Sequence, residues 1–190
     1  YLAGACWDQH IYLLRVVWQG AGTPGQQVVP HRTLSGNSSS PTHIMFTRDS
    51  QYLVSNSKDC QILVWKVSSG ERIRSLLMLR DAHWPCWTCP LGWPVVGVWK
   101  PQYDLTDINA VCQSSHEGPC GGSCIAVADD FQRVLLYRFP TPYANAMGRE
   151  YSGHASPVTN VRFNRENVLV SLGGGDHTLQ QWRLGDASGE

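Results

Sequence analysis

The sequence lacks an excess of charge of either sign. Its 190 residues carry 15 Lys and Arg against 15 Asp and Glu, so the formal net charge is zero. Nucleic acid and anionic membrane surfaces both attract basic proteins. We therefore expect neither as a main partner, although the balance is compatible with a local basic patch.

Long apolar runs are also missing. No stretch approaches the ~18 residues that a bilayer-spanning helix needs, so we expect no membrane partner. The first residues, "YLAGACWDQH", show no charged segment followed by an apolar one, as a signal peptide would. They read like the middle of a strand without an initiator Met. We expect the chain to be a fragment, or the C-terminal part, of a longer protein.

Helical periodicity is scarce as well. No stretch sustains a 3.6-residue apolar period with capping residues, which predicts little helix. Hydrophobic residues make up 42% and charged residues 16%, as in a globular domain. The seven cysteines are odd in number and accompany no secretory signal. This combination indicates a reduced, intracellular protein whose thiols are mostly buried.

One pattern does repeat along the chain. Residues 36–65, "GNSSSPTHIMFTRDSQYLVSNSKDCQILVW", match residues 153–182, "GHASPVTNVRFNRENVLVSLGGGDHTLQQW", without a gap. Both copies begin with Gly and end with Trp, and both place an Asp six residues before that Trp: Asp59 before Trp65, and Asp176 before Trp182. β-branched and aromatic runs separated by polar turns predict three short strands in each copy.

Two weaker copies extend the pattern. Residues 1–18 supply two strands around Asp8, and residues 106–139 supply three around Asp130, with Tyr137 near the Trp position after one extra residue. Successive Asp residues are 51, 71 and 46 positions apart. The unit is therefore in the mid-forties, with an insertion of roughly 25 residues before the third copy, which fits a four-stranded propeller blade.

We therefore predict an all-β fold, a β-propeller region of about four blades that forms an open arc. The expected blades cover approximately residues 1–33 (partial), 34–83, 84–150 with the insertion, and 151–184, followed by a tail at 185–190.

The copies resemble WD repeats, which begin near a Gly-His and end their third strand with Trp-Asp. The resemblance implies that the predicted propeller is of the WD40 type. Gly-His survives once, at 153–154, and Trp-Asp is degenerate in both good copies. The resemblance implies a structural hydrogen-bond network at four residues of the last copy and at three equivalent positions: His154, Ser171, Asp176 and Trp182, with Asp59, Trp65 and Asp130. His154, Ser171 and Asp176 are also the residue types of a hydrolase triad, but their place in a repeat favours structure.

A closer resemblance lies in four segments: "WTCPLGWPVVGVW" (87–99), "TDINAVCQS" (106–114), "ADDFQRVLLYRFP" (128–140) and residues 153–184. In content and order they are similar to the C-terminal part of the echinoderm microtubule-associated protein-like family. The resemblance implies a non-enzymatic protein of the cytoplasm and cytoskeleton that binds tubulin, microtubules and other proteins. It implies the last four or so blades of that family's second propeller.

Some family features are missing here, namely a coiled-coil heptad pattern, a basic run and a first propeller. The alternatives are a WD scaffold for a non-cytoskeletal complex and, less favoured, a zinc protein. Zinc prefers two closely spaced ligand pairs. The candidate ligands are Cys86, Cys89, Cys112, His116, Cys120 and Cys124.

The Cys86/Cys89 pair has the C-x-x-C spacing of a redox site, which requires a following helix. Prolines and a β-branched run follow instead, so we predict a strand in "WTCPLGWPVVGVW", with Cys89 in the core and Cys86 an incidental thiol. We expect no metal, cofactor or catalytic residue.

Three further features yield no chemistry. The glycine-rich segments at 118–124 and 173–175 lack the residues of a phosphate loop and are expected to be turns and a loop insertion. The adjacent Asp129 and Asp130 should point to opposite faces of a strand, which argues against an acid–base pair. Trp7 and Trp18 are expected to be exposed and to offer a contact patch.

Overall fold

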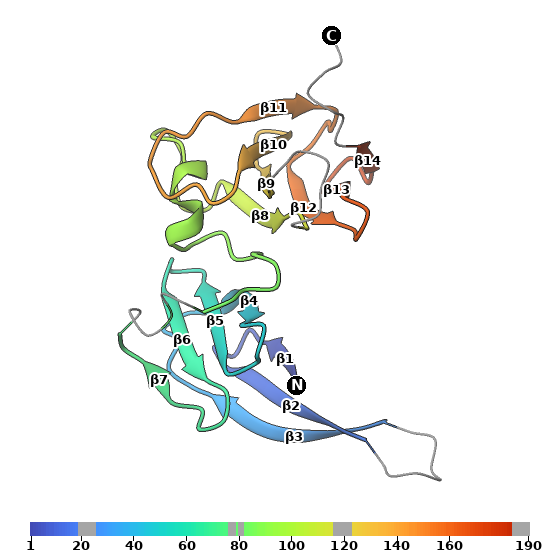
Figure 1. The fold of residues 1–190 in the computed structure, drawn as a ribbon. Helices are drawn as coiled ribbons and strands as arrows, with labels where there is room; N and C mark the ends of the chain where they lie inside the picture. The colour runs from blue at the N-terminus through green and yellow to red at the C-terminus, as the bar shows by residue number, and fades with distance from the viewer. Residues whose placement is uncertain (19–25, 76–78, 80–81, 116–122, 184–190) are drawn as a thin grey trace. The chain divides into compact units, whose positions relative to one another are not determined.

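Antiparallel strands dominate the regular structure, and the expected all-β fold is confirmed (Figure 1). The computed structural model describes residues 1–18, 26–75, 79, 82–115 and 123–183. The predicted tail at 185–190 and the loop insertion around 118–122 lie outside these residues. Contacts divide the chain into two compact units, Tyr1–Pro85 and Cys86–Glu190.

The first unit holds two sheets. The first sheet has the strand order β1-β2-β3, with β1 at Leu2–Ala5, β2 at Ile11–Trp18 and β3 at Gln26–Leu34. The second has the order β4-β5-β6-β7, with β4 at Pro41–Phe46, β5 at Tyr52–Ser57, β6 at Ile62–Lys66 and β7 at Arg72–Ile73. One apolar cluster joins facing side chains of both sheets: Ile11, Leu13, Leu34, Leu53, Leu63, Trp65 and Val67.

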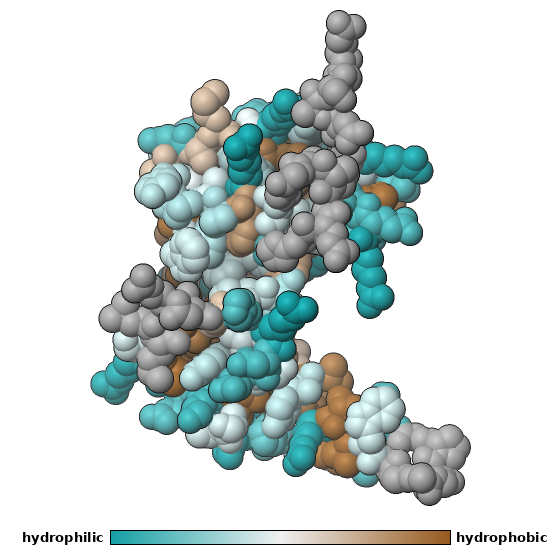
Figure 2. Space-filling model, in the orientation of Figure 1, coloured by the Kyte–Doolittle hydropathy of each residue, from teal (hydrophilic) through white to brown (hydrophobic). Residues whose placement is uncertain are grey.

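The β2–β3 hairpin extends past the rest of its sheet (Figure 1). β1 pairs with β2 only from Ile11 to Leu14, whereas β2 continues to pair with β3 as far as Trp18. Apolar side chains gather on the surface of this extension (Figure 2). Val17, Trp18 and Val28 are exposed there, Trp18 to 75%.

The second unit also holds two sheets. The third sheet has the order β11-β10-β9-β8, with β8 at Ile108–Gln113, β9 at Cys124–Asp129, β10 at Arg133–Arg138 and β11 at Arg149–Ser152. The fourth sheet has the order β12-β13-β14, with β12 at Val158–Phe163, β13 at Val168–Gly173 and β14 at Leu179–Arg183. Their shared cluster consists of Ala110, Cys112, Ala126, Ala128, Val134, Val158, Val161 and Leu169.

The three predicted strands of both good copies are present, but the gapless sequence match conceals a shift. Between β4 and β5, six residues separate the paired Phe46 and Leu53. Between β12 and β13, five separate Phe163 and Leu169. The next turn reverses this difference: five residues lie between Asn56 and Ile62, and six between Leu172 and Leu179. In the last copy the first turn is therefore one residue shorter, and the second one residue longer, than in residues 36–65. The two copies keep the same total length.

The strand predicted in residues 87–99 is wrong. A 3-10 helix, η2, occupies Trp93–Val98 with Pro94 in its first turn. Proline's fixed φ and missing N–H suit the start of a helix, and they outweigh the β-branched pair that follows. The Gly97 N–H donates to the Thr141 carbonyl at 2.7 Å, and only glycine fits this close approach, because a Cβ at position 97 would lie 2.8 Å from the Ala146 Cβ.

We propose that each sheet corresponds to one blade, with boundaries near residues 33, 83 and 150. The register supports this division, because an Asp-bearing turn joins the second and third strands of the second and fourth sheets. Among the described residues, no helix has the length and apolar character needed to cross a membrane.

Candidate functional site

The fourth sheet contains a continuous chain of side-chain hydrogen bonds, the fourth-sheet network. Trp182 Nε1–H donates to Ser171 Oγ at 2.8 Å, and Ser171 Oγ lies 2.7 Å from His154 Nε2. On the other side of the ring, His154 Nδ1 lies 3.0 Å from Thr178 Oγ1 and 3.4 Å from Asp176 Oδ2. The structure thus brings together all four residues predicted in the last copy and adds Thr178.

When the His154 imidazole is neutral, one arrangement of protons satisfies every bond in this network. Ser171 accepts from the Trp182 indole and donates its O–H to His154 Nε2, the ring nitrogen without a proton. His154 then carries its proton on Nδ1 and donates to Thr178 Oγ1, whose O–H donates to Asp176 Oδ1 at 3.0 Å. The network runs in one direction, from the indole of β14 to the carboxylate in the turn.

Asp176 organises the turn between β13 and β14. It accepts the Thr178 N–H at 3.0 Å and the Ala155 N–H at 2.8 Å. These backbone bonds, that of Thr178 first, hold the pKa of Asp176 below its ordinary value against the opposing effect of desolvation, with His154 contributing in the same direction. His177, between these residues, adopts a positive φ of 53°. The carboxylate therefore fixes a left-handed turn and joins it to the start of β12.

The second sheet carries a related network with a different end. Trp65 Nε1–H donates to Ser55 Oγ at 3.1 Å, and Ser55 donates to Asn37 Oδ1 at 3.3 Å. Asn37 stands where His154 stands in the last copy, and its Nδ2 donates to the Gln9 carbonyl at 3.2 Å. Gln9 lies in the turn between β1 and β2, so this network ties the two sheets of the first unit together.

Asp59 does not take part in that network. Its carboxylate accepts from Ser38 Oγ and, at 2.5 Å, from Ser57 Oγ. These two bonds, that of Ser38 first, lower the pKa of Asp59. Cys60 follows with a positive φ of 62°, as His177 follows Asp176. The turn has the same shape in the two sheets. The link that His154 makes between Ser171 and this turn is absent from the second sheet, where Asn37 connects Ser55 to Gln9 instead.

The third sheet departs further. Gln132, with a φ of 67°, is its left-handed turn residue, so Phe131 rather than Asp130 takes the Asp position. Asp130 instead accepts from Asn109 Nδ2 at 2.6 Å. Tyr137 takes the Trp position, buried to 2% exposure, but Val127 lies where the serine would be and no indole-to-serine bond forms.

A separate ion-pair network surrounds Asp129, which is fully buried. Its carboxylate accepts from the N–H groups of Phe131 and Arg133 at 3.0 Å each, from Arg133 Nε at 2.9 Å and from the Tyr103 hydroxyl at 2.9 Å. Arg133 also pairs with Glu150 at 3.1 Å. Every lone pair of this buried charge has a donor, which makes it structural rather than a free acid or base.

The triad-like residues are not arranged for catalysis. Ser171 is fully buried and its Oγ is already bonded to both Trp182 and His154. A nucleophile must reach a substrate atom, and the base must be free to take its proton. The hydrogen bonds of the fourth-sheet network instead link β13 and β14 to His154, which precedes β12.

Exposed aromatic side chains mark a different kind of surface. Trp7 is 79% exposed in the turn before β2, and Lys58 Nζ lies 3.7 Å from the centroid of its ring. Ser40 Oγ donates to the Trp7 carbonyl at 2.9 Å, and the Lys58 N–H donates to the Ser40 carbonyl at 3.1 Å. We call Trp7, Ser40 and Lys58 the turn-face platform. Trp18 is exposed on the β2–β3 hairpin and is not part of this platform.

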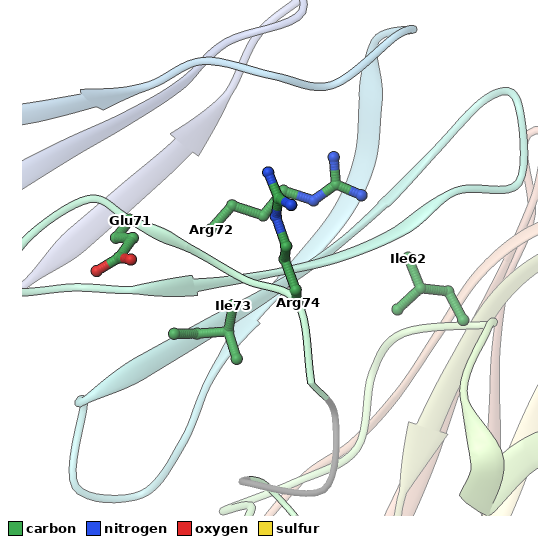
Figure 3. A pocket seen from close by; sticks show the side chains of 5 residues that line it. All are labelled: Ile62, Glu71, Arg72, Ile73 and Arg74. Atoms are coloured by element: carbon green, nitrogen blue, oxygen red, sulfur yellow. The ribbon is translucent and has the colours of Figure 1, made fainter.

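A pocket of about 610 Å³ lies beside β7 and is lined by Ile62, Glu71, Arg72, Ile73 and Arg74 (Figure 3). Arg72 and Arg74 point to one side of the segment and Ile73 to the other, as an extended backbone requires (Figure 3). One carboxylate beside two guanidinium groups does not form an acid–base pair. The pocket offers charge and apolar surface without a reactive group.

Cys89, one of the candidate zinc ligands, is fully buried, and burial raises the pKa of its thiol. Cys86 Sγ is half-buried and lies 3.9 Å from Cys112 Sγ. In the part of the chain that the structure describes, no three His, Cys, Asp or Glu side chains converge as metal ligands. His116 and Cys120 of the predicted zinc set lie outside that part.

Sequence reasoning missed several residues that the structure connects. Thr178 follows Asp176 by two positions, the spacing of a side-chain-stabilised turn, and that signal was available. Ser55 was not recognisable, because the gapless match places Leu172 opposite it. The Lys58–Trp7 contact joins turns of two different copies, and no local pattern predicts it.

Comparison with known proteins adds a second line of evidence. The sequence model described as the echinoderm microtubule-associated protein second beta-propeller matches residues 1–184. The chain is 41% identical over 186 residues to echinoderm microtubule-associated protein-like 3 of Mus musculus, covering 97% of the chain and 20% of that relative. It is 40% identical over 185 residues to echinoderm microtubule-associated protein-like 1 of Rattus norvegicus, covering 97% and 22%.

A third relative is echinoderm microtubule-associated protein-like 4 of Xenopus tropicalis, 39% identical over 185 residues, with 96% of the chain and 19% of the relative covered. The chain thus spans about a fifth of the length of these relatives. Together with the four antiparallel sheets, the matches confirm the predicted partial WD40-type β-propeller. The chain belongs to the echinoderm microtubule-associated protein-like family, in the region of its second β-propeller.

Proposed function

We propose that this chain is a protein-interaction module that contributes to microtubule association and to organisation of the cytoskeleton, with tubulin or microtubules as the partner. The observation that carries the proposal is the match over residues 1–184 to a propeller of a family named for microtubule association. Relatives that are about 40% identical to the chain are also named as echinoderm microtubule-associated protein-like proteins. The corresponding location is the cytoplasm, at the microtubule cytoskeleton.

We also propose that the module is not an enzyme and that the fourth-sheet network is structural. Ser171 and Asp129 are fully buried with their bonding capacity used by neighbouring groups. Asp176 is occupied by two backbone N–H groups. These arrangements support strand and turn geometry, and they leave function to exposed turns, as is usual where a rigid β scaffold presents loops.

The turn-face platform is the part of the first unit best suited to a partner. Trp7 offers an exposed indole, and Lys58 covers one face of that ring. Tryptophan with a nearby cation is typical of the side chains that dominate binding energy at protein interfaces. The hydrogen bonds through Ser40 hold the two turns together, so little conformational freedom is lost on binding.

Co-sedimentation with polymerised tubulin tests the proposal. The purified 190-residue chain is compared with full-length echinoderm microtubule-associated protein-like 3 of mouse as the reference. We expect both to pellet with microtubules and to stay in the supernatant without them. A chain that stays in the supernatant while the full-length relative pellets contradicts the proposal for this module. Binding lost at raised ionic strength would assign the contact to exposed charges such as Lys58.

A further inference from the structure

Cys86 and Cys112 form a facing pair of thiols, which we call the thiol pair. Their sulfur atoms are 3.9 Å apart, although 26 positions separate them in sequence. A disulfide requires about 2.05 Å between the sulfurs, so a shift of about 2 Å, within the range of side-chain rotation, brings them to bonding distance.

The backbone holds this pair in register. The Trp87 N–H donates to Gln113 Oε1 at 2.9 Å, and the Gln113 N–H donates to the Trp87 carbonyl at 2.9 Å. These two bonds lay the residues after Cys86 along the end of β8, where Cys112 precedes Gln113. The Gln113 carbonyl lies 3.2 Å from Cys86 Sγ and 3.7 Å from Cys112 Sγ, within reach of an S–H from either sulfur.

The surroundings favour the thiolate form of one member of the pair. Cys112 Sγ accepts the Phe163 N–H at 3.3 Å, and Arg162 contributes a positive charge nearby. The hydrogen bond from Cys86, followed by these groups, lowers the pKa of Cys112 against the effect of burial. The same hydrogen bond raises the pKa of Cys86, which keeps its proton. Thiolate character therefore concentrates on Cys112.

Position and pKa distinguish this pair from the other buried thiol of the segment. Cys86 is half-buried and brings the pair to the surface, while Cys112 is 2% exposed beneath it. Cys89 is fully buried, and burial raises the pKa of its thiol, which makes it a poor nucleophile.

We propose that Cys86 and Cys112 are a reversible oxidation site, which forms an intramolecular disulfide when the chain meets a hydroperoxide such as hydrogen peroxide. The Cys112 thiolate attacks one peroxide oxygen, the O–O bond breaks and hydroxide leaves, which gives a sulfenic acid at Cys112. The Cys86 sulfur then attacks the sulfenic sulfur, the S–O bond breaks and a second hydroxide leaves. The two thiol protons convert both hydroxides to water, and two electrons pass from sulfur to peroxide.

Disulfide formation would fasten the segment around Trp87 covalently to β8. It would also alter the Cys112 sulfur that accepts the Phe163 N–H of β12. Cys112 belongs to the cluster shared by the third and fourth sheets, together with Val158 and Val161. Oxidation at the thiol pair therefore reaches the packing between two sheets of the second unit.

The wild-type chain tests the proposal by differential alkylation. The reduced chain is exposed to hydrogen peroxide, unfolded and treated with one maleimide, then reduced and treated with an isotopically distinct maleimide. The reduced chain has seven thiols. We expect two of them to disappear on oxidation, Cys86 and Cys112 to carry the second label, Cys89 to carry the first, and dithiothreitol to restore all seven. Peptide mapping without reduction should show the Cys86–Cys112 cross-link.

Two variants sharpen the test. C86A removes the half-buried member, and we expect it to abolish the disulfide. C60A, which removes a half-buried cysteine of the first unit, should form the disulfide as the wild type does. If Cys86 and Cys112 keep the first label, or if either is linked to another cysteine, the proposal is overturned. Because the wild-type mapping needs no substitution, a variant that fails to fold does not decide the result.

Discussion

The indole N–H of Trp65 donates to Ser55 Oγ across 3.1 Å, and both side chains are buried to 1% exposure or less. The fourth sheet repeats this relationship with Trp182 and Ser171 at 2.8 Å. Each serine also makes a second hydrogen bond, Ser55 with Asn37 and Ser171 with His154. The serine is therefore the shared element of the two networks, and the residue beyond it varies.

The first prediction concerns this serine. S55A removes one atom and leaves the Trp65 indole N–H without its acceptor in a fully buried position. A buried donor that loses its partner costs about 1–3 kcal/mol, and we expect the free energy of unfolding to fall by that amount. Urea unfolding followed by tryptophan fluorescence measures it. S35A, at an exposed serine, is the control and should change stability by less than ~0.5 kcal/mol. Equal stability of S55A and S35A would contradict the prediction.

Ser55 also shows where sequence reasoning stops. The repeat, the strands and the pairing of Asp with Trp are periodic, so a comparison of the two copies finds them. The turn lengths differ by one residue in opposite directions, which preserves the total and shifts β5 against β13. Only the pairing of strands reveals that Ser55 and Ser171 are equivalent. A length comparison cannot detect two changes that cancel.

The second prediction concerns acid stability. Asp176 has a folded-state pKa below its ordinary value of 3.8, so the unfolded chain binds a proton more readily. Its stabilisation is fully present above the unfolded pKa and is lost as pH falls through the folded pKa. We expect D176N to be less stable than wild type at pH 7 and to lose less additional stability on acidification below about pH 4.

Urea midpoints at neutral and acidic pH measure this difference. E71Q, which removes an exposed carboxylate of the pocket, controls for the loss of one negative charge. If D176N and wild type lose stability in parallel on acidification, the carboxylate of Asp176 does not have the role that its hydrogen bonds indicate.

The third prediction uses two tyrosines of the second unit as a matched pair. The Tyr103 hydroxyl donates to buried Asp129 at 2.9 Å and accepts from Arg133 Nη2 at 2.6 Å. The Tyr137 hydroxyl is buried, and among the described residues it has no hydrogen-bond partner. We expect Y103F to lower the free energy of unfolding by about 1 kcal/mol and Y137F to leave it unchanged or raise it, because desolvating an unpaired hydroxyl is unfavourable.

Chemical denaturation of both variants provides the comparison, since each loses one oxygen and keeps its ring. A destabilised Y137F would show that its hydroxyl has a partner in the folded chain. An unchanged Y103F would show that Arg133 and the Phe131 N–H suffice to satisfy the Asp129 carboxylate.

Residues 84–99 show a second limit of the sequence. The family resemblance includes residues 87–99, and the C-x-x-C spacing marks Cys86 and Cys89 as a candidate pair. The strand predicted in this segment is nevertheless a 3-10 helix. The decisive contacts are distant: Cys86 meets Cys112, and Gly97 meets Thr141. The propensity of the valines favours a strand, but Pro94 at the start of the helix and the contact of Gly97 with Thr141 together outweigh it. Non-periodic insertions are the places where such contacts outweigh local pattern.

The last prediction concerns the turn-face platform. Trp7 and Trp18 are matched in exposure, at 79% and 75%, but only Trp7 lies beneath Lys58. If the platform is the microtubule contact, W7A should weaken co-sedimentation about tenfold, the factor that ~1.4 kcal/mol produces, and K58A should weaken it and reduce its salt dependence. W18A should pellet like wild type, since the hairpin is a separate surface. Loss of binding in W18A with binding retained in W7A would place the contact on the β2–β3 hairpin instead. Circular dichroism of all three variants ensures that the folded chain is compared in each case.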